Sequence, residues 1–432
     1  MGRKIDTKPL TREVVRITKL IHGGQGLGVL SDGRKVFVWN ALPGETVRAQ
    51  VIKQKNSYSE AVAEEIMVVS PERVPASEDN YLSTSPWQIM KFSSENEHKK
   101  RIVIDLFSHE KLTLPAIADV VHDDREWYYR NKMEYSFWGD DDGLHLALHQ
   151  RGSHGKQIVA GSKLAKPSID AGANAVSSQL SAMGARAGDL KTVMVRSDAH
   201  GNTVAALFVK LESFKKLELP PELKGLRVYH SNPKSPASVP TKLLYELGDT
   251  ILKDKISGNL LSYDPVGFFQ ANLPVFELAA QSINLITKDA AKVVDFYSGV
   301  GSIGLSVAAT TTLVETDDLA VDMAKMNVGI KPVKVVKATA EMALNYIESD
   351  TTVIVDPPRA GLHQKVIDRM LEVLPPKIVY LSCNPATQAR DLKLLSERYD
   401  ITQFEIYNFF PKTPHIETLA VVTQKQYAGK KI

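Results

Sequence analysis

Four short apolar runs between residues 291 and 385 constrain the fold of this chain more than any other feature. Each run is as long as a strand and consists almost entirely of apolar or β-branched residues, with Asp295 inside the first, as in parallel strands that are buried on both faces. Since open parallel α/β sheets bind ligands beyond the carboxyl ends of their strands, the runs predict an α/β, Rossmann-like domain with one crevice. The runs cover residues 293–296, 311–314, 352–355 and 378–381, and are followed by a glycine-rich turn, Glu315, Asp356 and Cys383.

The glycine-rich turn, residues 297–304, reads Tyr-Ser-Gly-Val-Gly-Ser-Ile-Gly, and we expect a helix after it. Its glycines let the backbone turn tightly and approach a ligand. The Lys-Ser/Thr pair of a triphosphate-binding loop is absent. Glu315 could accept the ribose hydroxyls of an adenosine. The turn alone also fits NAD, and Glu315 could equally be a solvated acid at a strand end.

The third run ends in Asp356-Pro357-Pro358-Arg359. Two prolines cannot continue a central strand, so they fix the backbone as it leaves the sheet and hold the carboxylate at the crevice. Such an acid can form hydrogen bonds to the edge of a planar base. The same Asp-Pro-Pro sequence occurs in enzymes that methylate amines, so it indicates a methyltransferase and leaves the target open.

Cys383 is the single cysteine of the chain and follows the fourth run. A lone cysteine is most often a small buried hydrophobic residue. With Asp356 on the preceding strand and Glu417 after a later proline-rich turn, a nucleophile is the better interpretation. The reactive thiolate would then need a lowered pKa, from ~8.5, or a base nearby. One cysteine also excludes an internal disulfide and fits a reducing, cytoplasmic compartment.

The N-terminal region, residues 8–70, has short β-type runs separated by glycine turns, which predicts a small five-stranded barrel. Residues 1–75 carry twelve Lys/Arg and eight Asp/Glu, so positive charge is concentrated there. The barrel could therefore bind RNA backbone and bases, although a solvated basic rim without a partner would have the same composition. The candidate contacts are Lys19, His22, Arg34, Lys35, Lys53, Lys55 and Tyr58.

The central region, residues 75–262, predicts an α+β domain, with a helix near 95–117 that packs on the following domain and a hairpin over 132–149. Histidines at alternate positions of a strand lie on one face of the sheet and do not surround a metal ion, so we expect no metal site here. No apolar run approaches ~18 residues, so we expect no membrane span. The histidines in question are His145, His149 and His154.

Four ordered motifs resemble those of the RNA uracil-5-methyltransferases, which modify tRNA or 23S ribosomal RNA. The resemblance extends over nearly the whole chain, through Phe-Gln-Ala-Asn at 269–272 back to an N-terminal TRAM barrel. The motifs are Phe-Tyr-Ser-Gly-Val-Gly at 296–301, Asp-Pro-Pro-Arg-Ala-Gly-Leu at 356–362, Ser-Cys-Asn-Pro-Ala-Thr at 382–387, and Phe-Pro-Lys-Thr-Pro-His-Ile-Glu at 410–417.

The resemblance implies a methyltransferase domain over 263–432 that uses S-adenosylmethionine, a TRAM-like, RNA-binding barrel and a central α+β domain. It also implies Cys383 as nucleophile and Glu417 as general base. Ser302 stands where the family commonly has asparagine. The implied cofactor contacts are Gln270, Tyr297, Ser302, Glu315 and Asp356.

The function implied is methylation of C5 of a uridine in RNA, with 23S rRNA slightly favoured over tRNA, by a monomer with no obligate protein partner. Two alternatives stay open: a methyltransferase acting on another base atom, and a non-catalytic RNA-binding or folding factor. Many relatives hold an iron–sulfur cluster on four cysteines. One cysteine cannot supply four thiolates, so we expect no cluster.

Overall fold

The computed structural model describes residues 11–151 and 155–425. Their internal contacts divide the chain into two compact units. Of the described residues, the smaller unit holds 11–102, 149–151, Gly155 and the loop Phe410–His415; the larger unit holds the remainder. One large sheet falls within each of the ranges 8–70, 75–262 and 263–432. Those ranges as domain boundaries stay predictions.

The N-terminal sheet has six strands in the order β1-β5-β6-β4-β3-β2, one more than the five expected. The additional strand, β2, has only two residues, too few for a sequence pattern to indicate. Alternate residues along β4 and β5 are buried, and they form a core of small β-branched residues and alanines. The strands are β1 (Arg12–Arg16), β2 (Lys19–Leu20), β3 (Gly26–Val29), β4 (Lys35–Trp39), β5 (Thr46–Gln54) and β6 (Tyr58–Val68).

After the short helix α1 (Tyr81–Thr84), the chain forms α2 (Phe92–His109), which ends eight residues before the expected end near 117. The expectation was wrong here because Lys111 adopts a left-handed φ of 57° and Pro115 follows, neither of which continues an α-helix. The ring of Phe107 contacts that of Phe404 in β21 (Tyr399–Tyr407), with centroids 4.9 Å apart.

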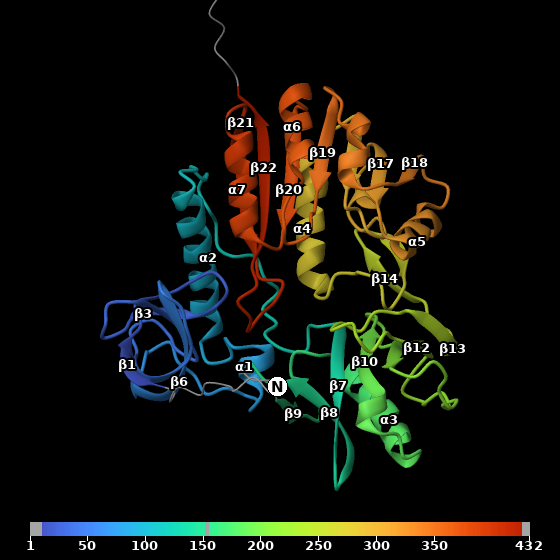
Figure 1. Ribbon diagram of the computed structural model, residues 1–432. Helices are drawn as coiled ribbons and strands as arrows, with labels where there is room; N and C mark the ends of the chain where they lie inside the picture. Colours follow the sequence, from blue (N-terminus) through green and yellow to red (C-terminus); the bar gives the residue numbers. More distant parts are fainter. Residues whose placement is uncertain (1–10, 152–154, 426–432) are drawn as a thin grey trace, which may run out of the picture. The chain divides into compact units, whose positions relative to one another are not determined.

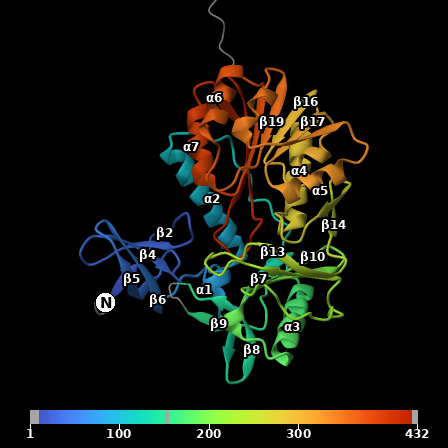
Figure 2. The same cartoon turned by 45° about the vertical axis from the view of Figure 1, so that its right-hand side comes forward.

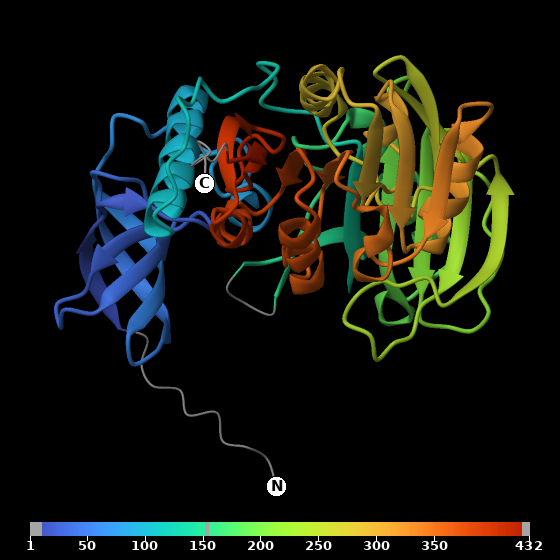
Figure 3. The same cartoon turned by 90° about the horizontal axis from the view of Figure 1, so that it is seen from above.

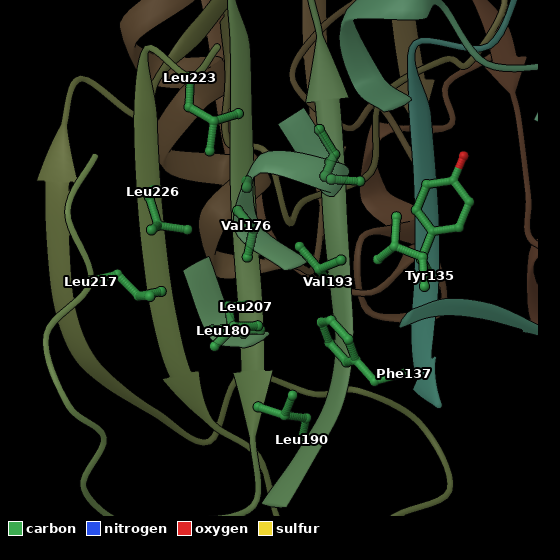
Figure 4. Close-up of a cluster of buried hydrophobic side chains, with 14 of the residues drawn as sticks. Tyr135, Phe137, Val176, Leu180, Leu190, Val193, Leu207, Leu217, Leu223 and Leu226 are labelled. Carbon is green, nitrogen blue, oxygen red and sulfur yellow. The ribbon is translucent and has the colours of Figure 1, made fainter. Parts of the chain in front are cut away.

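The central sheet has seven strands in the order β13-β12-β11-β10-β7-β8-β9, and β7 and β8 form the expected hairpin. The helix α3 (Pro167–Ala182) covers one face, and its Val176 and Leu180 point into the cluster of apolar strand residues shown in Figure 4. The strands are β7 (Lys132–Asp140), β8 (Gly143–His149), β9 (Lys156–Ile158), β10 (Leu190–Ser197), β11 (Thr203–Val209), β12 (Gly225–His230) and β13 (Lys242–Gly248).

The C-terminal sheet has the order β18-β17-β16-β19-β20-β22-β21, and its first five strands are parallel. It confirms the Rossmann-like class predicted from the apolar runs. Figure 2 shows β16, β17 and β19 side by side, and Figure 1 shows β19, β20 and β22 of the same sheet. The strands are β16 (Lys292–Phe296), β17 (Thr310–Glu315), β18 (Val333–Lys337), β19 (Thr351–Val355), β20 (Lys377–Ser382), β21 and β22 (Glu417–Gln424).

Helices flank this sheet, and seen from above α4 and α6 lie on opposite faces (Figure 3). A small hairpin of β14 and β15 precedes α4. No helix in the described part of the chain is long and apolar enough to cross a membrane. These elements are β14 (Leu252–Ile256), β15 (Asn259–Tyr263), α4 (Leu273–Ile286), α5 (Asp318–Val328), α6 (Gln364–Val373) and α7 (Pro385–Leu395).

The α-helix expected after the glycine-rich turn does not form. A single 3-10 turn, Gly304–Ser306, follows, and β17 already begins at Thr310. Few residues separate the two, and a helix of two turns needs about seven. The turn of residues 297–304 is therefore fixed by its own contacts and by the strands, without support from a following α-helix.

Candidate active site

The glycine-rich turn leaves β16 in a backbone conformation that is rare for most residues. Tyr297, Gly299 and Gly301 all have positive φ, at 61°, 56° and 89°. A Cβ at Gly301 would lie 2.6 Å from Cδ1 of Leu305, so only glycine fits there. The buried Asp295 closes the turn, because its Oδ2 accepts a hydrogen bond of 2.9 Å from the Gly304 amide. Burial raises the pKa of Asp295 to about 8.

A hollow opens between this turn, the loop before α4 and the end of β19. Four of the five cofactor contacts implied by the sequence line it, and the Oγ of Ser298, which also lines it, is buried without a hydrogen-bond partner in the described residues. Its empty volume, including space open to solvent, is about 330 Å³. The lining residues are Phe268, Phe269, Gln270, Tyr297, Ser298, Gly299, Val300, Ser302, Ile303 and Asp356.

Glu315, the fifth contact, lies at the end of β17 and is joined to the turn by hydrogen bonds. Its Oε2 accepts from the Gly299 amide at 2.9 Å, and its Oε1 accepts from the amides of Thr316 and Asp317 at 2.6 and 2.8 Å. These three bonds fix the carboxylate. Since a carboxylate has about four lone-pair sites, it keeps the capacity to accept a hydroxyl.

The loop before α4 presents one aromatic ring and buries the next. Phe269 is buried and stacks on Tyr263 with ring centroids 3.8 Å apart, whereas Phe268 is 70 % exposed at the hollow. Asn131 holds the loop, because its Nδ2 donates to the Gln270 carbonyl at 2.8 Å. The adjacent pair of phenylalanines is the signal that one of them faces a ligand, since neighbouring side chains in extended backbone point to opposite sides.

Cys383 and Glu417 come together at the facing ends of two antiparallel strands. Ser382, the last residue of β20, pairs with Thr418 of β22. In an antiparallel pair, the residue after Ser382 faces the residue before Thr418, so Cys383 faces Glu417 if the register continues. Directly opposed Cβ atoms in such a pair lie ~5 Å apart. Cys383 is partly exposed, and Glu417 is buried.

Burial and neighbouring acids raise the pKa values of these groups. The pKa of Cys383 rises to about 12, because the thiol is desolvated and lies near the negative charges of Glu417 and Asp356. Desolvation, with the charge of Asp356, also raises the pKa of Glu417 well above its usual value. Desolvation alone raises that of Asp356 to about 7. The thiol pKa is therefore not lowered, so attack requires a base nearby.

Arg359 supplies positive charge at this site, a role that the sequence analysis did not assign. Its guanidinium lowers the pKa of both Cys383 and Glu417, against the larger effect of burial. Its carbonyl accepts from Nδ2 of Asn384 at 2.9 Å and from Oγ1 of Thr387 at 3.2 Å. Arginine directly after Asp-Pro-Pro was the available signal, since the prolines place it at the same rim as the acid.

No group of three or more potential metal ligands gathers in residues 11–151 and 155–425. His145 instead contacts Asp140, with Nε2 and Oδ1 2.9 Å apart, and His154 lies outside the described residues. Near α1, the side chain of Gln88 donates to Glu78 and to Ser85, each at 2.6 Å. These hydrogen bonds tie Gln88 to the segment around α1. The absence of a cluster stays a prediction.

Comparisons with known proteins agree with the motifs. The model of the tRNA (Uracil-5-)-methyltransferase family matches residues 265–425, and that of the TRAM domain matches residues 11–63. An uncharacterized RNA methyltransferase of Lactobacillus johnsonii is 32 % identical over 445 aligned positions, which cover 95 % of this chain and 98 % of the relative. An uncharacterized RNA methyltransferase of Thermotoga maritima is 28 % identical, and the match covers 95 % of this chain and 99 % of that relative.

Among solved structures, the tRNA (uracil-54, C5)-methyltransferase of Pyrococcus abyssi in complex with S-adenosyl-L-homocysteine superposes with a TM-score of 0.75. It is 22 % identical, and the match covers 95 % of this chain and 99 % of that one. At this identity, the likeness shows the shared fold.

The fold and the family model define a methyltransferase with S-adenosylmethionine as its methyl donor. Within that class, the chain belongs to the RNA uracil-5-methyltransferase family, with an N-terminal TRAM domain. It is thus an RNA (uracil-5-)-methyltransferase. The family excludes the non-catalytic RNA-binding factor kept open above.

The electrostatics of the site predict how the thiol reacts with a small reagent. Because Arg359 lowers the pKa of Cys383, Arg359→Gln should raise that pKa and slow alkylation by iodoacetamide at fixed pH. We expect labelling to be at least ~2-fold slower, because the thiolate fraction falls as the pKa rises. The chain has one cysteine, so the label is unambiguous. Arg186→Gln, which removes an exposed guanidinium paired with Asp189, is the matched control. Equal rates in the two variants would contradict the assignment.

Proposed function

We propose that the chain methylates C5 of a specific uridine in RNA, with Cys383 as the covalent nucleophile and Glu417 as the general base. The observation that supports this most directly is the register of β20 and β22, which sets a thiol opposite a buried carboxyl. A methyltransferase acting on an exocyclic amine has no need of either group. Uracil C5 needs both, because it becomes nucleophilic only after an addition at C6.

In the first step, the sulfur of Cys383 forms a bond to C6 and electron density moves to C5 and O4. The thiol proton must pass to a neighbouring carboxylate. Asp356, with a pKa of about 7, is ionised in part of the molecules near neutral pH and could receive it. The positive charge of Arg359 favours both the thiolate and the negative charge on the ring, because both are electron-rich.

The hollow beside Asp356 fits the methyl donor by its chemistry. The Ser298 hydroxyl, which has no partner among the described residues, and the Asp356 carboxyl both line the hollow, so both can bind polar groups of a ligand. When bound, S-adenosylmethionine supplies the methyl group. We propose that five residues hold it there, by the edge of its base, its ribose and its polar tail: Gln270, Tyr297, Ser302, Glu315 and Asp356.

The last step requires a base. After methylation, C5 carries a proton that must leave before the C5–C6 double bond can re-form and the bond from C6 to sulfur can break. Glu417 takes this proton in our proposal. Its raised pKa makes the carboxylate a stronger base than an exposed glutamate, at the cost of a smaller ionised fraction at neutral pH.

The target atom is inaccessible in a stacked helix, so the uridine must flip out, most readily from a single-stranded loop. The exposed ring of Phe268 at the hollow offers a surface on which such a base could stack. We keep 23S rRNA as the first substrate to test and tRNA as the second, in the cytoplasm. The monomeric state stays a prediction.

The substrate can be identified directly. We expect 23S rRNA from a strain lacking this protein to have lost 5-methyluridine at one position, which mass spectrometry of nuclease fragments would locate. Adding back the wild-type chain should restore it, and Cys383→Ala should not. Loss confined to tRNA would move the substrate to tRNA, and unchanged 5-methyluridine in both would contradict the proposed target.

The assigned roles predict a trapped intermediate. Glu417→Gln cannot accept the C5 proton, so methyl transfer should occur and elimination should stall, which leaves RNA bound to sulfur. Incubation with substrate RNA and methyl-labelled cofactor should give a labelled protein–RNA adduct that survives denaturation.

Cys383→Ala is the control, because it should form no adduct and no product while it still binds S-adenosylmethionine. Label found only in free RNA with Glu417→Gln, or on protein without RNA, would overturn the two roles and favour an amine target.

The barrel predicts a salt-dependent contribution to RNA binding. Lys53 is held by Glu60 at 2.7 Å, which makes it a poorer phosphate contact than the sequence suggested. Lys35 pairs across the strands with Tyr58, whose ring lies 5.5 Å from that of Phe37, so charge and aromatic surface coincide there. Replacing Lys35 and Lys55 by Gln should weaken RNA binding and reduce the slope of log K against log salt by up to ~0.7 per lost contact.

In the same titration, Lys53→Gln should change the slope less, because its charge is already neutralised. Affinity for S-adenosylmethionine should be equal in all three proteins. An unchanged slope in the double variant would assign RNA binding to another surface.

A further inference from the structure

The loop Phe410–His415 leads directly into Glu417, with only Ile416 between. Its contacts place it in the same compact unit as the barrel and the first part of α2. Lys412 in this loop has a left-handed φ of 63°, which is unfavourable for a residue with a side chain. Such a conformation persists only where surrounding contacts hold it, so those contacts matter for the residue that follows the loop.

A buried ion pair on α2 supplies part of this hold. Glu95 and Lys99 lie one helical turn apart, both side chains are 0 % exposed, and Nζ and Oε1 are 2.9 Å apart. Nζ of Lys99 also donates to the Phe410 carbonyl at 3.1 Å. Burial lowers the pKa of Lys99. A buried pair of this kind contributes little net stability, because desolvation offsets the attraction, so its presence suggests another role.

Glu95 also binds the loop backbone. Both of its carboxylate oxygens accept from the Lys412 amide, each at 3.0 Å. The Lys412 ammonium is buried as well, and it donates to the Met90 carbonyl at 3.3 Å. One carboxylate thus holds the amide at the strained position, while Lys99 holds the carbonyl two residues before it.

The barrel side of this unit holds the other part of the loop through Trp87. The Trp87 amide donates to the Lys412 carbonyl at 3.1 Å, and its indole Nε1 donates to the Gly24 carbonyl at 3.0 Å. Gly24 approaches Pro414 so closely that a Cβ on it would lie 2.5 Å from Cβ of the proline. The loop is therefore anchored at its start, middle and end.

We propose that Glu95 is a positioning residue for the general base: by anchoring the Lys412 amide, it fixes the point from which the chain enters β22 and so places the Glu417 carboxyl. This inference rests on the proposed roles of Cys383 and Glu417. Cys383 is held by separate contacts, those of Asn384 with the Arg359 carbonyl. Loosening the loop should therefore slow elimination and leave addition and methyl transfer largely intact.

A matched pair of double variants separates anchoring from charge. Glu95→Ala/Lys99→Met removes the ion pair and the acceptor for the Lys412 amide. Glu95→Gln/Lys99→Met removes the same charges but keeps an amide oxygen that can accept from it. In single-turnover assays with substrate RNA and labelled cofactor, the alanine variant should eliminate ~10- to 100-fold more slowly and accumulate the adduct. The glutamine variant should turn over within about twofold of wild type.

Four further measurements make the result specific. S-adenosylmethionine binding shows whether each variant is folded. Glu65→Gln, which breaks an exposed ion pair with Arg48, is the control for charge loss in the barrel. If the alanine variant does not fold, Glu95→Asp replaces it, since it keeps the charge and shortens the reach by one methylene. Glu417→Gln, run in parallel, is the reference for stalled elimination.

The positioning role would be overturned if the folded alanine variant, or Glu95→Asp, eliminated at the wild-type rate. It would also be overturned if the alanine and glutamine double variants stalled equally. If Glu417→Gln itself accumulates no adduct, the proposed function fails, and the two failures are thereby distinguished.

Discussion

The antiparallel pairing of β20 with β22 is the interaction on which the proposed chemistry depends. The first five strands of this sheet are parallel, and parallel strands deliver their carboxyl ends to one edge. A parallel neighbour of β20 would bring another carboxyl end beside Cys383. Because β22 runs the other way, the edge receives the beginning of a strand instead, and Glu417 is its first residue. Backbone hydrogen bonds between these two strands thus bring the proposed nucleophile and the proposed base to the same edge of the sheet.

The same arrangement brings two carboxyl groups close to the Cys383 thiol at a site with little access to water, and this raises the pKa values of the groups there. Asp356 and Glu417 each disfavour ionisation of Cys383, and Arg359 opposes them only in part. A thiol with a pKa of about 12 is protected from adventitious alkylation and oxidation, which proceed through the thiolate. The site would gain its nucleophile only when a proton can be passed on, so reactivity would be tied to the presence of substrate.

The parts of the site that were predictable are those encoded locally. A continuous apolar run followed by an acid or a thiol gives both the strand and the side chain at its end, as for Asp356 and Cys383. What depends on contacts between distant segments was missed: the exposure of Phe268 beside a buried neighbour, the three amides bonded by Glu315, and the pairing of Lys53 with Glu60. The α-helix expected after the glycine-rich turn is absent because the next strand, β17, begins at Thr310, only a few residues after the turn.

The chain order of the two proposed catalytic groups explains why the contacts of the distant Glu95 bear on one step and not the other. Cys383 follows a parallel strand of the sheet, and its turn is held by residues of the same domain. Glu417 follows a loop whose contacts belong to the barrel-containing unit. Addition would therefore be controlled within the methyltransferase domain, whereas elimination would also be sensitive to the N-terminal region.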